Sequence, residues 1–251
     1  MAEMNTNSIA NPAIARPIGS PAESYDCVMR MLNQLRPRHV LDCPGGEGFF
    51  SQQLINAGYQ VSSCDICPER WRIPAIPCSF ADLNDALPYA DNEFDAIACL
   101  NGLHRVWARG RALRELARVL KPEGHLLLTF VNNINLAHRV GFLLSGSVLP
   151  NAAGPPHAFF PEATNPGARF RYGMTLADVL GGAKSVGLKI SAITGVRRSF
   201  RSWLLSPLAI AQRLTLPFLP GAYKKHCFVH ESSRMSVLLS DYLLVVAQKP
   251  S

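Results

Sequence analysis

The chain has 251 residues, of which 48% are apolar and 17% charged, and its 25 basic and 18 acidic side chains give a net charge of +7. This composition excludes a disordered, highly charged tail, and the length fits one large α/β domain or a domain with a small cap. Residues 1–185 hold 16 basic and 16 acidic side chains, and residues 186–251 hold nine basic and two acidic ones. The whole positive excess therefore lies in the last quarter of the chain.

The N-terminal part and the cysteines give the first expectations. Residues 1–19 lack the apolar stretch of a secretory signal, and we expect a mobile leader before a domain that spans 20–251. Seven cysteines form an odd, unpatterned set, which favours reduced thiols and a cytoplasmic protein. Cys64 and Cys67 have the spacing of a zinc or redox pair. No second pair and no nearby histidine completes a ligand set, so we expect no metal and interpret both as small residues at a strand end.

Short helices and strands alternate along the first half of the chain. Ser20, Pro21 and Glu23 form a helix-start signature and predict a helix to about Leu35. The elements predicted after it are a strand over His39–Asp42, a glycine-rich turn over 43–48, a helix over Phe49–Ala57, strands over Gln60–Cys64, Ile76–Phe80 and Phe94–Leu100, a helix over Arg111–Leu120 and a strand over His125–Val131. This alternation predicts an α/β fold with a doubly wound, mostly parallel sheet.

The second half is less regular. Residues 132–174 are rich in Gly, Pro and Asn and predict an irregular insertion, of the kind that forms a lid or a substrate-binding region, with a short helix near Leu136–Leu144. The elements predicted after it are a helix over Thr175–Val186, capped by Thr175, and strands over Leu188–Thr194 and Ser236–Ala247. Between these strands, Trp203–Leu219 is strongly apolar but is interrupted by prolines and polar residues, so it predicts a surface segment and not a membrane-spanning helix.

Three features fall at the carboxyl ends of the first three predicted strands, which is where parallel α/β sheets bind ligands. The first is the turn that follows Asp42, in which glycines let the backbone approach a ligand closely. The second is Asp65, about twenty residues further on, where a carboxylate can accept both hydroxyls of a ribose. The third is Asp82, which can accept the exocyclic amine of an adenine. Together they predict a cofactor that contains adenosine.

Several motifs make this pattern specific: HVLDCPGGEG (39–48), the run Asp65–Glu69, ADLNDALPYADNEFDAI (81–97) and LRELARVLKPEGHLLL (113–128). In these residues, across roughly 25–131, the chain resembles the class I, Rossmann-like S-adenosylmethionine-dependent methyltransferases, and within them the methyltransferase type 11 group. The resemblance implies a seven-stranded sheet with an irregular insertion after the fifth strand, and S-adenosylmethionine as the cofactor. A nicotinamide enzyme is the main alternative, but Ser51 stands where the dinucleotide fingerprint has its third glycine.

The resemblance also implies roles for individual residues. Those expected at the cofactor are Asp42, Gly45, Gly46 and Gly48 around its methionine part, Asp65 at the ribose, Ile66 on the adenine face, Asp82 and Leu83 at the adenine edge, and Leu100 and Asn101 near the sulfonium. Pro44 stands where many family members have the first glycine of the turn. A proline removes one amide donor, although its fixed φ still suits a turn.

Methyl transfer needs alignment of the acceptor more than chemical groups from the protein, because the sulfonium is already an activated donor. A general base helps when the acceptor is a hydroxyl or a protonated amine. His104, just after the fourth strand, is the first candidate and His157, in the insertion, is the second. A structural or helix-capping role explains His104 equally well.

The acceptor is less well defined by the sequence. The chain has Cys99–Leu103 where methyltransferases of adenine and cytosine amines carry an acidic-Pro-Pro-aromatic motif, which makes nucleic acid a less favoured partner. Basic residues flank the apolar stretch within the segment 197–235 and suit an anionic membrane surface, through 197–225, or an amphiphilic, anionic acceptor. A solvated helix with its apolar face in the core explains the same pattern.

We therefore expect a methyltransferase that acts on an O or N atom of a small or amphiphilic molecule, such as a metabolite, a glycan or a lipid-linked intermediate. The alternatives are a non-catalytic accessory protein that binds S-adenosylmethionine, and an RNA or DNA methyltransferase. We expect a cytoplasmic location, with peripheral contact at a membrane surface as a variant of it.

Overall fold

The described residues of the computed structural model are 14–17, 21–145, 173–198, 204–221 and 228–251. Within them, seven strands form one sheet in the order β3-β2-β1-β4-β5-β7-β6. The strands are β1 (His39–Asp42), β2 (Gln60–Asp65), β3 (Cys78–Phe80), β4 (Phe94–Leu100), β5 (Leu120–Val131), β6 (Lys189–Arg198) and β7 (Ser240–Gln248). Strands β1 to β5 pair in parallel, whereas β7 runs antiparallel to both of its neighbours. This confirms the predicted doubly wound, mostly parallel sheet.

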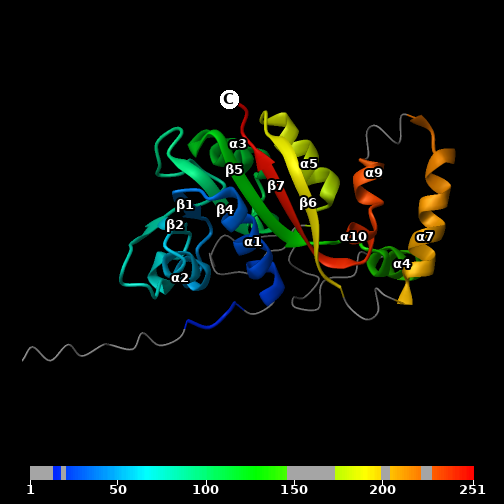
Figure 1. Ribbon diagram of the computed structural model, residues 1–251, viewed down its shortest axis with the longest axis horizontal. Coiled ribbons are helices and arrows are strands. Elements are labelled where there is room, and N and C mark those ends of the chain that lie inside the picture. Colours follow the sequence, from blue (N-terminus) through cyan, green and yellow to red (C-terminus); the bar gives the residue numbers. More distant parts are fainter. Residues whose placement is uncertain (1–13, 18–20, 146–172, 199–203, 222–227) are drawn as a thin grey trace, which may run out of the picture.

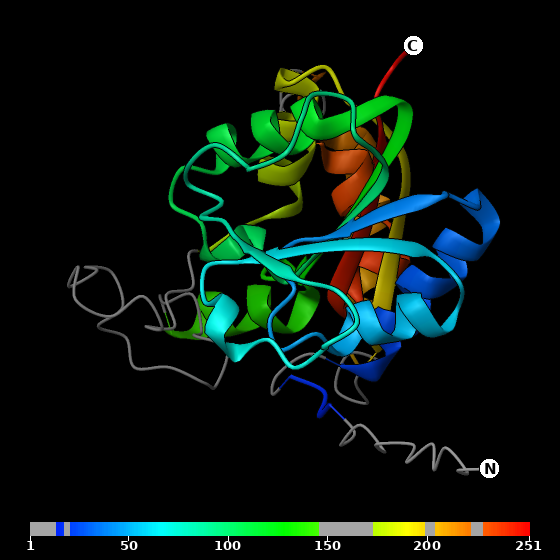
Figure 2. The same cartoon turned by 90° about the vertical axis from the view of Figure 1, so that its left-hand side faces the viewer.

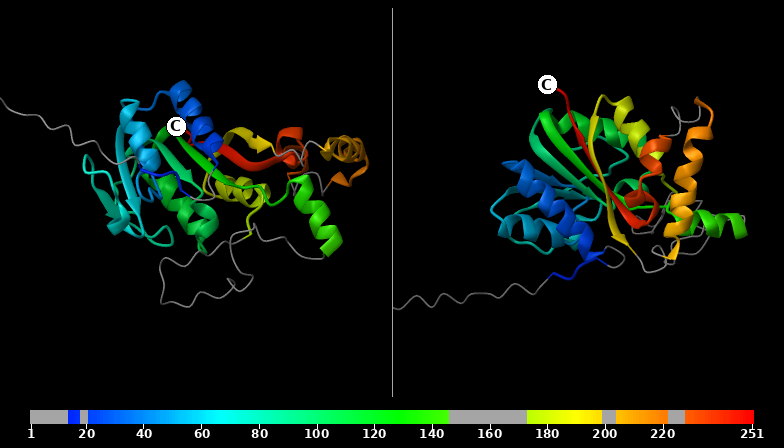
Figure 3. Two further views of the ribbon diagram at one scale, coloured as in Figure 1. Left: turned by 90° about the horizontal axis from the view of Figure 1, so that it is seen from below. Right: turned by 45° about the vertical axis from the view of Figure 1, so that its right-hand side comes forward.

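Helices cover both faces of the sheet (Figure 2). In the described residues they are α1 (Ala22–Leu35), α2 (Phe49–Asn56), α3 (Arg109–Val119), α4 (Leu136–Ser145), α5 (Leu176–Ser185), α7 (Ser206–Thr215), α9 (Val229–Ser232) and α10 (Met235–Leu238), with 3-10 turns η1 (Pro68–Arg70), η2 (Leu103–Arg105) and η3 (Leu216–Phe218). Helices α4 and α7 lie at the end of the sheet opposite to α2 (Figure 3).

Each face of the sheet has its own hydrophobic core. Helices α3 and α5 pack on one face, in a cluster that includes Ile97 and Leu128 of the strands. Helices α1 and α2 pack on the other face, where Leu32 and Leu54 meet Ala96. Successive strand residues point to opposite faces, so β4 supplies both cores from adjacent positions. Buried on both sides, such a strand is apolar along its whole length, which is why Phe94–Leu100 is readily identified in the sequence.

The predicted final strand starts too early. Met235–Leu238 form the short helix α10, and β7 begins only at Ser240. The side-chain amide of Asn132, fully buried at the end of β5, donates to the carbonyl oxygens of Val237 at 2.5 Å and Ser240 at 2.8 Å. Contacts from more than a hundred residues away therefore hold this run in a turn of helix, although its residues suit a strand equally well.

Other boundaries also differ. Strand β5 begins at Leu120 and not at His125, and β6 ends at Arg198 and not at Thr194. Pro21 is the N-cap of α1 and not its first residue, and no side chain caps the helix there. Strand β3 begins at Cys78 and not at Ile76, because the Ile76 carbonyl oxygen accepts a hydrogen bond from the Trp71 indole instead of pairing in the sheet. The capping box predicted at Thr175 is confirmed, with Asp178 as its second member.

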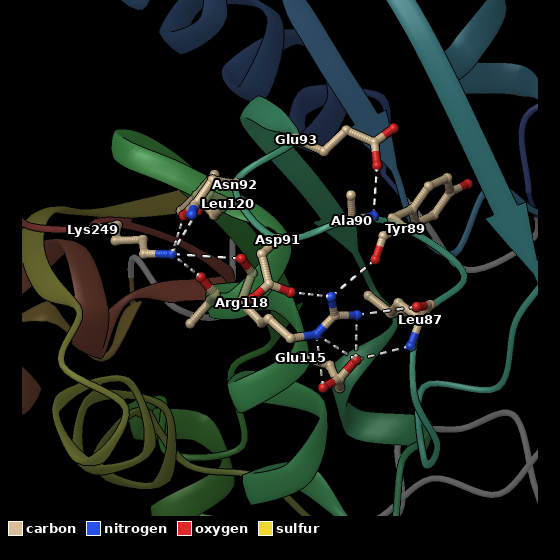
Figure 4. Close-up of polar contacts among 11 residues, drawn as sticks. Leu87, Tyr89, Ala90, Asp91, Asn92, Glu93, Glu115, Arg118, Leu120 and Lys249 are labelled. Carbon is tan, nitrogen blue, oxygen red and sulfur yellow. Dashed lines mark hydrogen bonds and ion pairs between the residues drawn. The ribbon is translucent and has the colours of Figure 1, made fainter.

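The connection between β3 and β4 is fixed to helix α3 by one arginine (Figure 4). The Arg118 guanidinium donates to the carbonyl oxygens of Leu87 and Tyr89 and forms ion pairs with Asp91 at 2.6 Å and Glu115 at 2.8 Å. The Arg118 guanidinium also lowers the pKa of Glu115, whose carboxylate in turn accepts from the Leu87 amide. The connection that starts at Asp82 is thus held rigidly against the domain.

Lys249, close to the end of the sequence, attaches the end of α3 to the same connection. The Lys249 ammonium donates to the carbonyl oxygens of Ala117 and Leu120 at 2.8 and 2.7 Å and to Asn92 Oδ1 at 2.8 Å (Figure 4). A cation at this place satisfies carbonyl groups that the end of α3 leaves without intrahelical partners.

Candidate functional site

The glycine-rich turn 43–48 is attached to the strands on both sides of β1. The amide of Cys43 donates to the Ala98 carbonyl of β4 at 3.0 Å, and the amide of Gly45 donates to the Cys64 carbonyl of β2 at 2.9 Å. Pro44, which follows a cis peptide bond, contributes no amide. Because β1, β2, β3 and β4 run in parallel, their carboxyl ends meet here, and we call this edge with its turn the ligand edge.

The three glycines of the turn differ in the space around them and in their backbone conformation. A Cβ on Gly45 would collide with Ser63 Oγ and lie 3.0 Å from the Trp71 ring, and one on Gly48 would lie 2.7 Å from the Ile73 side chain. Gly48 also has φ at 99°. Gly46 has φ at 60° and no atom within 4 Å of a Cβ position. The turn therefore packs against the protein at two of its glycines and faces open space at Gly46.

Residues of the connection after β2 cover the packed side of the turn. The Trp71 indole donates to the carbonyl oxygens of Ile73 and Ile76, both at 2.9 Å. Glu47 of the turn forms ion pairs with Arg70 at 3.0 Å and with Arg72 at 3.1 Å. The sequence-based reasoning missed this role of Trp71, and the one available signal was a large aromatic residue in the connection after β2.

Asp65 lies at the centre of the site. Its Oδ2 accepts from the Gly46 amide at 2.8 Å and its Oδ1 accepts from the Cys67 amide at 2.9 Å, with 9% of the residue exposed. Each carboxylate oxygen has a second lone pair, so both can accept a further hydrogen bond. Ile66, the next residue, is 38% exposed. The structure thus brings an acceptor pair, an apolar side chain and the open side of Gly46 together.

Asp42 is fully buried below the turn and has a structural role. Its Oδ2 accepts a 2.6 Å hydrogen bond from the Ser51 hydroxyl, and the Ser63 hydroxyl donates to its carbonyl oxygen. Burial raises the pKa of Asp42 to about 7, with the Ser51 hydrogen bond acting in the opposite direction. The predicted role of Asp42 in shaping the turn fits this position, since it ties β1 to α2.

Asp82 and Leu83 lie at the end of β3. Asp82 Oδ1 accepts from the amide and the side chain of Asn84, both at 2.8 Å, and Leu83 is buried. Asn84 Oδ1 in turn accepts from the amides of Trp107 and Ala108, so this connection is joined to the one after β4. The link through Asn84 was not foreseen, because the two segments are more than twenty residues apart.

The segment after β4 closes the edge next to the turn. Leu100 is buried, and Asn101 has φ at 53° with its amide donating to the Thr129 carbonyl at 3.0 Å. Gly102 packs directly on the Pro44 ring. His104 lies in η2 and is 6% exposed. His157 lies outside the described residues, so both catalytic assignments stay predictions.

The two cysteines with C-x-x-C spacing are both free thiols and differ in burial. Cys64 is fully buried in β2 and Cys67 is half-buried after it. Burial raises the pKa of Cys67, and burial also raises the pKa of nearby Cys99 to about 12. In the part of the chain that the structure describes, no group of three or more His, Cys, Asp or Glu side chains is arranged to hold a metal ion.

Comparisons with known proteins agree with this geometry. Residues 41–128 match a family described as "Methyltransferase domain". The malonyl-[acyl-carrier protein] O-methyltransferase of Erwinia pyrifoliae is 32% identical over 139 residues, which are 49% of this chain and 52% of that protein. A demethylmenaquinone methyltransferase of Paenarthrobacter aurescens is 36% identical over 94 residues, which are 36% of this chain and 37% of that protein.

A solved structure extends the likeness of fold to most of the chain. The 1,6-didemethyltoxoflavin-N1-methyltransferase of Burkholderia thailandensis, crystallised with bound 1,6-didemethyltoxoflavin and S-adenosylhomocysteine, superposes with a TM-score of 0.52 over 92% of this chain and 79% of that one, at 14% identity. At this identity the likeness concerns the fold alone. The alignments to the two curated relatives span about half of their length or less.

The strand order defines a Rossmann-like domain, and residues 41–128 within it match the methyltransferase domain family. This part of the chain is similar to class I S-adenosylmethionine-dependent methyltransferases, so the comparisons support the expected family and its cofactor, S-adenosylmethionine.

Proposed function

We propose that this chain transfers a methyl group from S-adenosylmethionine to an O or N atom of a small or amphiphilic acceptor. The observation that supports this most directly is Asp65, whose carboxylate joins the Gly46 amide to the end of β2 and keeps lone pairs for a ligand. The open side of Gly46 and the exposed Ile66 fit the cofactor beside it.

The chain's own residues would act mainly by positioning. Asp65 would hold the ribose, Ile66 would pack on the adenine, and the Gly46 backbone would approach the methionine part. The cofactor, when bound, supplies the activated methyl group. Holding the acceptor in line is then most of the catalysis, because alignment replaces a bimolecular encounter. The buried His104 would serve as a base only for an acceptor atom that reaches η2.

The names of the relatives support an acceptor other than a nucleic acid. One is named for a malonyl group on an acyl-carrier protein and the other for demethylmenaquinone. The first name specifies O-methylation of a group attached to a carrier protein, and the second name does not specify the methylated atom. Methylation of an O or N atom by this chain is therefore part of the proposal. Incubation with methyl-labelled cofactor and fractionated cell extract, followed by identification of the labelled species, tests the acceptor directly.

Calorimetry with S-adenosylhomocysteine tests the cofactor site. We expect Asp65→Ala to weaken binding about 100-fold or more, because charge-assisted hydrogen bonds are lost and the turn loses one of its hydrogen bonds to β2. Asp85→Ala, which removes an exposed carboxylate paired with Arg111, is the matched control and should bind as the wild type does. Equal affinity of Asp65→Ala and wild type would sink the assignment.

The two alternatives give different results. A non-catalytic accessory protein would bind S-adenosylhomocysteine as tightly but label nothing in any extract. A nucleic-acid methyltransferase would bind RNA or DNA with a steep dependence on salt concentration, because phosphate contacts release counterions. Labelling of a small or lipid-like molecule together with weak, salt-independent binding of nucleic acid supports the proposal.

A further inference from the structure

Helices α4 and α7 lie together at one end of the molecule (Figure 1), and exposed apolar side chains are concentrated on and next to them. Among the described residues, eleven large apolar side chains are classed as exposed, and eight of them belong to this end. We call these eight the α4–α7 patch: Phe142, Leu143, Leu144, Leu204, Leu208, Ile210, Leu214 and Phe218. Leu143 and Leu144 are each 82% exposed and Phe218 is 86% exposed. A concentration of this kind marks an interaction surface on a folded domain.

Helix α7 is apolar on two opposite sides. Ala209 is fully buried in a small cluster with Leu136 of α4 and Leu238 of α10. Ile210 and Leu214, which are one turn apart and turned away from that cluster, are 54% and 69% exposed. A surface helix normally has a polar outer face. The outer face of α7 therefore has the composition of a buried face, and we expect a binding partner to cover it.

The charges of this region favour an anionic cover. Residues 136–145 and 204–221 contain no aspartate or glutamate, and Arg213 is exposed on α7. Arg197, at the end of β6, is exposed as well. A second copy docked through the same patch would bring like charges together, whereas an anionic surface would complement them.

We propose that the α4–α7 patch binds the surface of an anionic lipid bilayer, with its leucines and phenylalanines in the interfacial region and Arg213 at the headgroups. Helices that combine large apolar residues with Arg or Lys bind membranes in this way, lying in the plane of the interface. None of the described helices combines the length and apolarity needed to cross a bilayer. This sharpens the sequence-based expectation of membrane contact through 197–225 by adding α4 and selecting α7.

The proposal does not depend on methyl transfer. The helices that carry the patch, α4 and α7, follow β5 and β6 in the chain, whereas the ligand edge is formed by β1 to β4. The two helices lie at the end of the molecule opposite to α2 (Figure 3). Failure of membrane binding would leave the cofactor site unaffected, and the reverse also holds.

Vesicle flotation tests the proposal with the full chain. We expect binding to vesicles of 70% phosphatidylcholine and 30% phosphatidylglycerol, and much weaker binding to phosphatidylcholine alone or at high salt. The double variants Leu143→Gln/Leu144→Gln and Ile210→Gln/Leu214→Gln should each lower the bound fraction about tenfold or more, since each removes two apolar side chains from the interface. Their thermal midpoints should stay close to that of the wild type, because all four side chains are exposed.

The matched control is Phe80→Gln, which removes a 64% exposed aromatic residue at the other edge of the sheet. It should float with anionic vesicles as the wild type does. Failure of the wild type to float, or equal flotation of the double variants, would overturn the proposal. A concentration-dependent dimer in sedimentation experiments that the double variants abolish, without vesicle binding by the wild type, would assign the patch to a second copy instead.

Discussion

The ligand edge and the α4–α7 patch both present side chains at the surface, but the side chains differ in polarity and in how they are held. At the ligand edge, polar groups are tied to specific partners: Asp65 to two backbone amides and Glu47 to two arginines. At the patch, apolar side chains project outward from a module held by a small core of Leu136, Ala209, Leu238 and Leu239. The hydrogen bonds and ion pairs of the first region fix the positions of its polar groups, as recognition of a small ligand requires. The second region offers exposed apolar area and positive charge, which suit contact with a broad, deformable surface such as a lipid bilayer.

The largest effect of a packing change at constant pH should follow Gly48→Ala, in the rigid region. The left-handed backbone at φ 99° and the approach of Ile73 to 2.7 Å should together lower the free energy of unfolding by about 3 kcal/mol and weaken S-adenosylhomocysteine binding. Gly58→Ala is the matched control, because Gly58 has φ at 85° but no neighbour within 4 Å. Chemical denaturation of both variants checks this. Equal losses would mean that packing against Ile73 does not fix the glycine.

The module behind the patch should be separable from the ligand edge. Leu238→Ala, in the small core, should lower the free energy of unfolding by about 2–3 kcal/mol, because a fully buried leucine leaves a cavity. S-adenosylhomocysteine affinity should change less than twofold. Urea denaturation followed together with calorimetry checks both quantities, and a large loss of affinity would contradict the independence of the two regions.

Asp42 gives the ligand edge a pH dependence that the patch lacks. Its pKa is about 7 in the folded chain and lies near 3.8 when unfolded, so folding favours its protonated form. Its contribution to stability is therefore complete below pH 4 and is lost as the pH rises to about 7, at about 1.4 kcal/mol for each pH unit. Asp42→Asn removes this dependence.

Unfolding free energies of wild type and Asp42→Asn between pH 4.5 and 8 check this expectation. The difference between the two should change over that range and become constant above pH 7. Ser51→Ala should extend the change to higher pH, because the Ser51 hydrogen bond lowers the pKa of Asp42. A difference that stays constant over the whole range would show that Asp42 is not titrating in the folded protein.

The smallest effect on stability should come from the patch. Leu214→Ala should change the free energy of unfolding by less than about 0.5 kcal/mol, because the side chain is 69% exposed and fills no core space. Thermal unfolding in buffer checks this value. A loss near that of Leu238→Ala would mean that Leu214 packs within the protein and is not available to a membrane.

Much of the fold and part of the site could be predicted from local patterns. The strands β1, β2, β4 and β5 are apolar runs bounded by turn residues, and Asp65 is recognisable from its distance to the glycines of the turn. Trp71 and Asn84 were not recognisable, because Trp71 packs against Gly45 and Gly48 of the turn and Asn84 accepts from Trp107 and Ala108, all of which lie in other segments. The helix α10 was also missed, since Asn132 imposes it from the end of β5.

The sequence by itself determined the alternation of helices and strands, the order of the turn, Asp65 and Asp82 along the chain, and the concentration of positive charge in residues 186–251. Those features depend on neighbouring residues and on composition. Only the tertiary structure decided which glycines pack against protein and which faces open space, that Asp42 is buried, and that α4 joins α7 in one exposed apolar patch. The physical reason is that burial and close packing depend on contacts between segments far apart in the chain. Local sequence patterns do not predict these contacts.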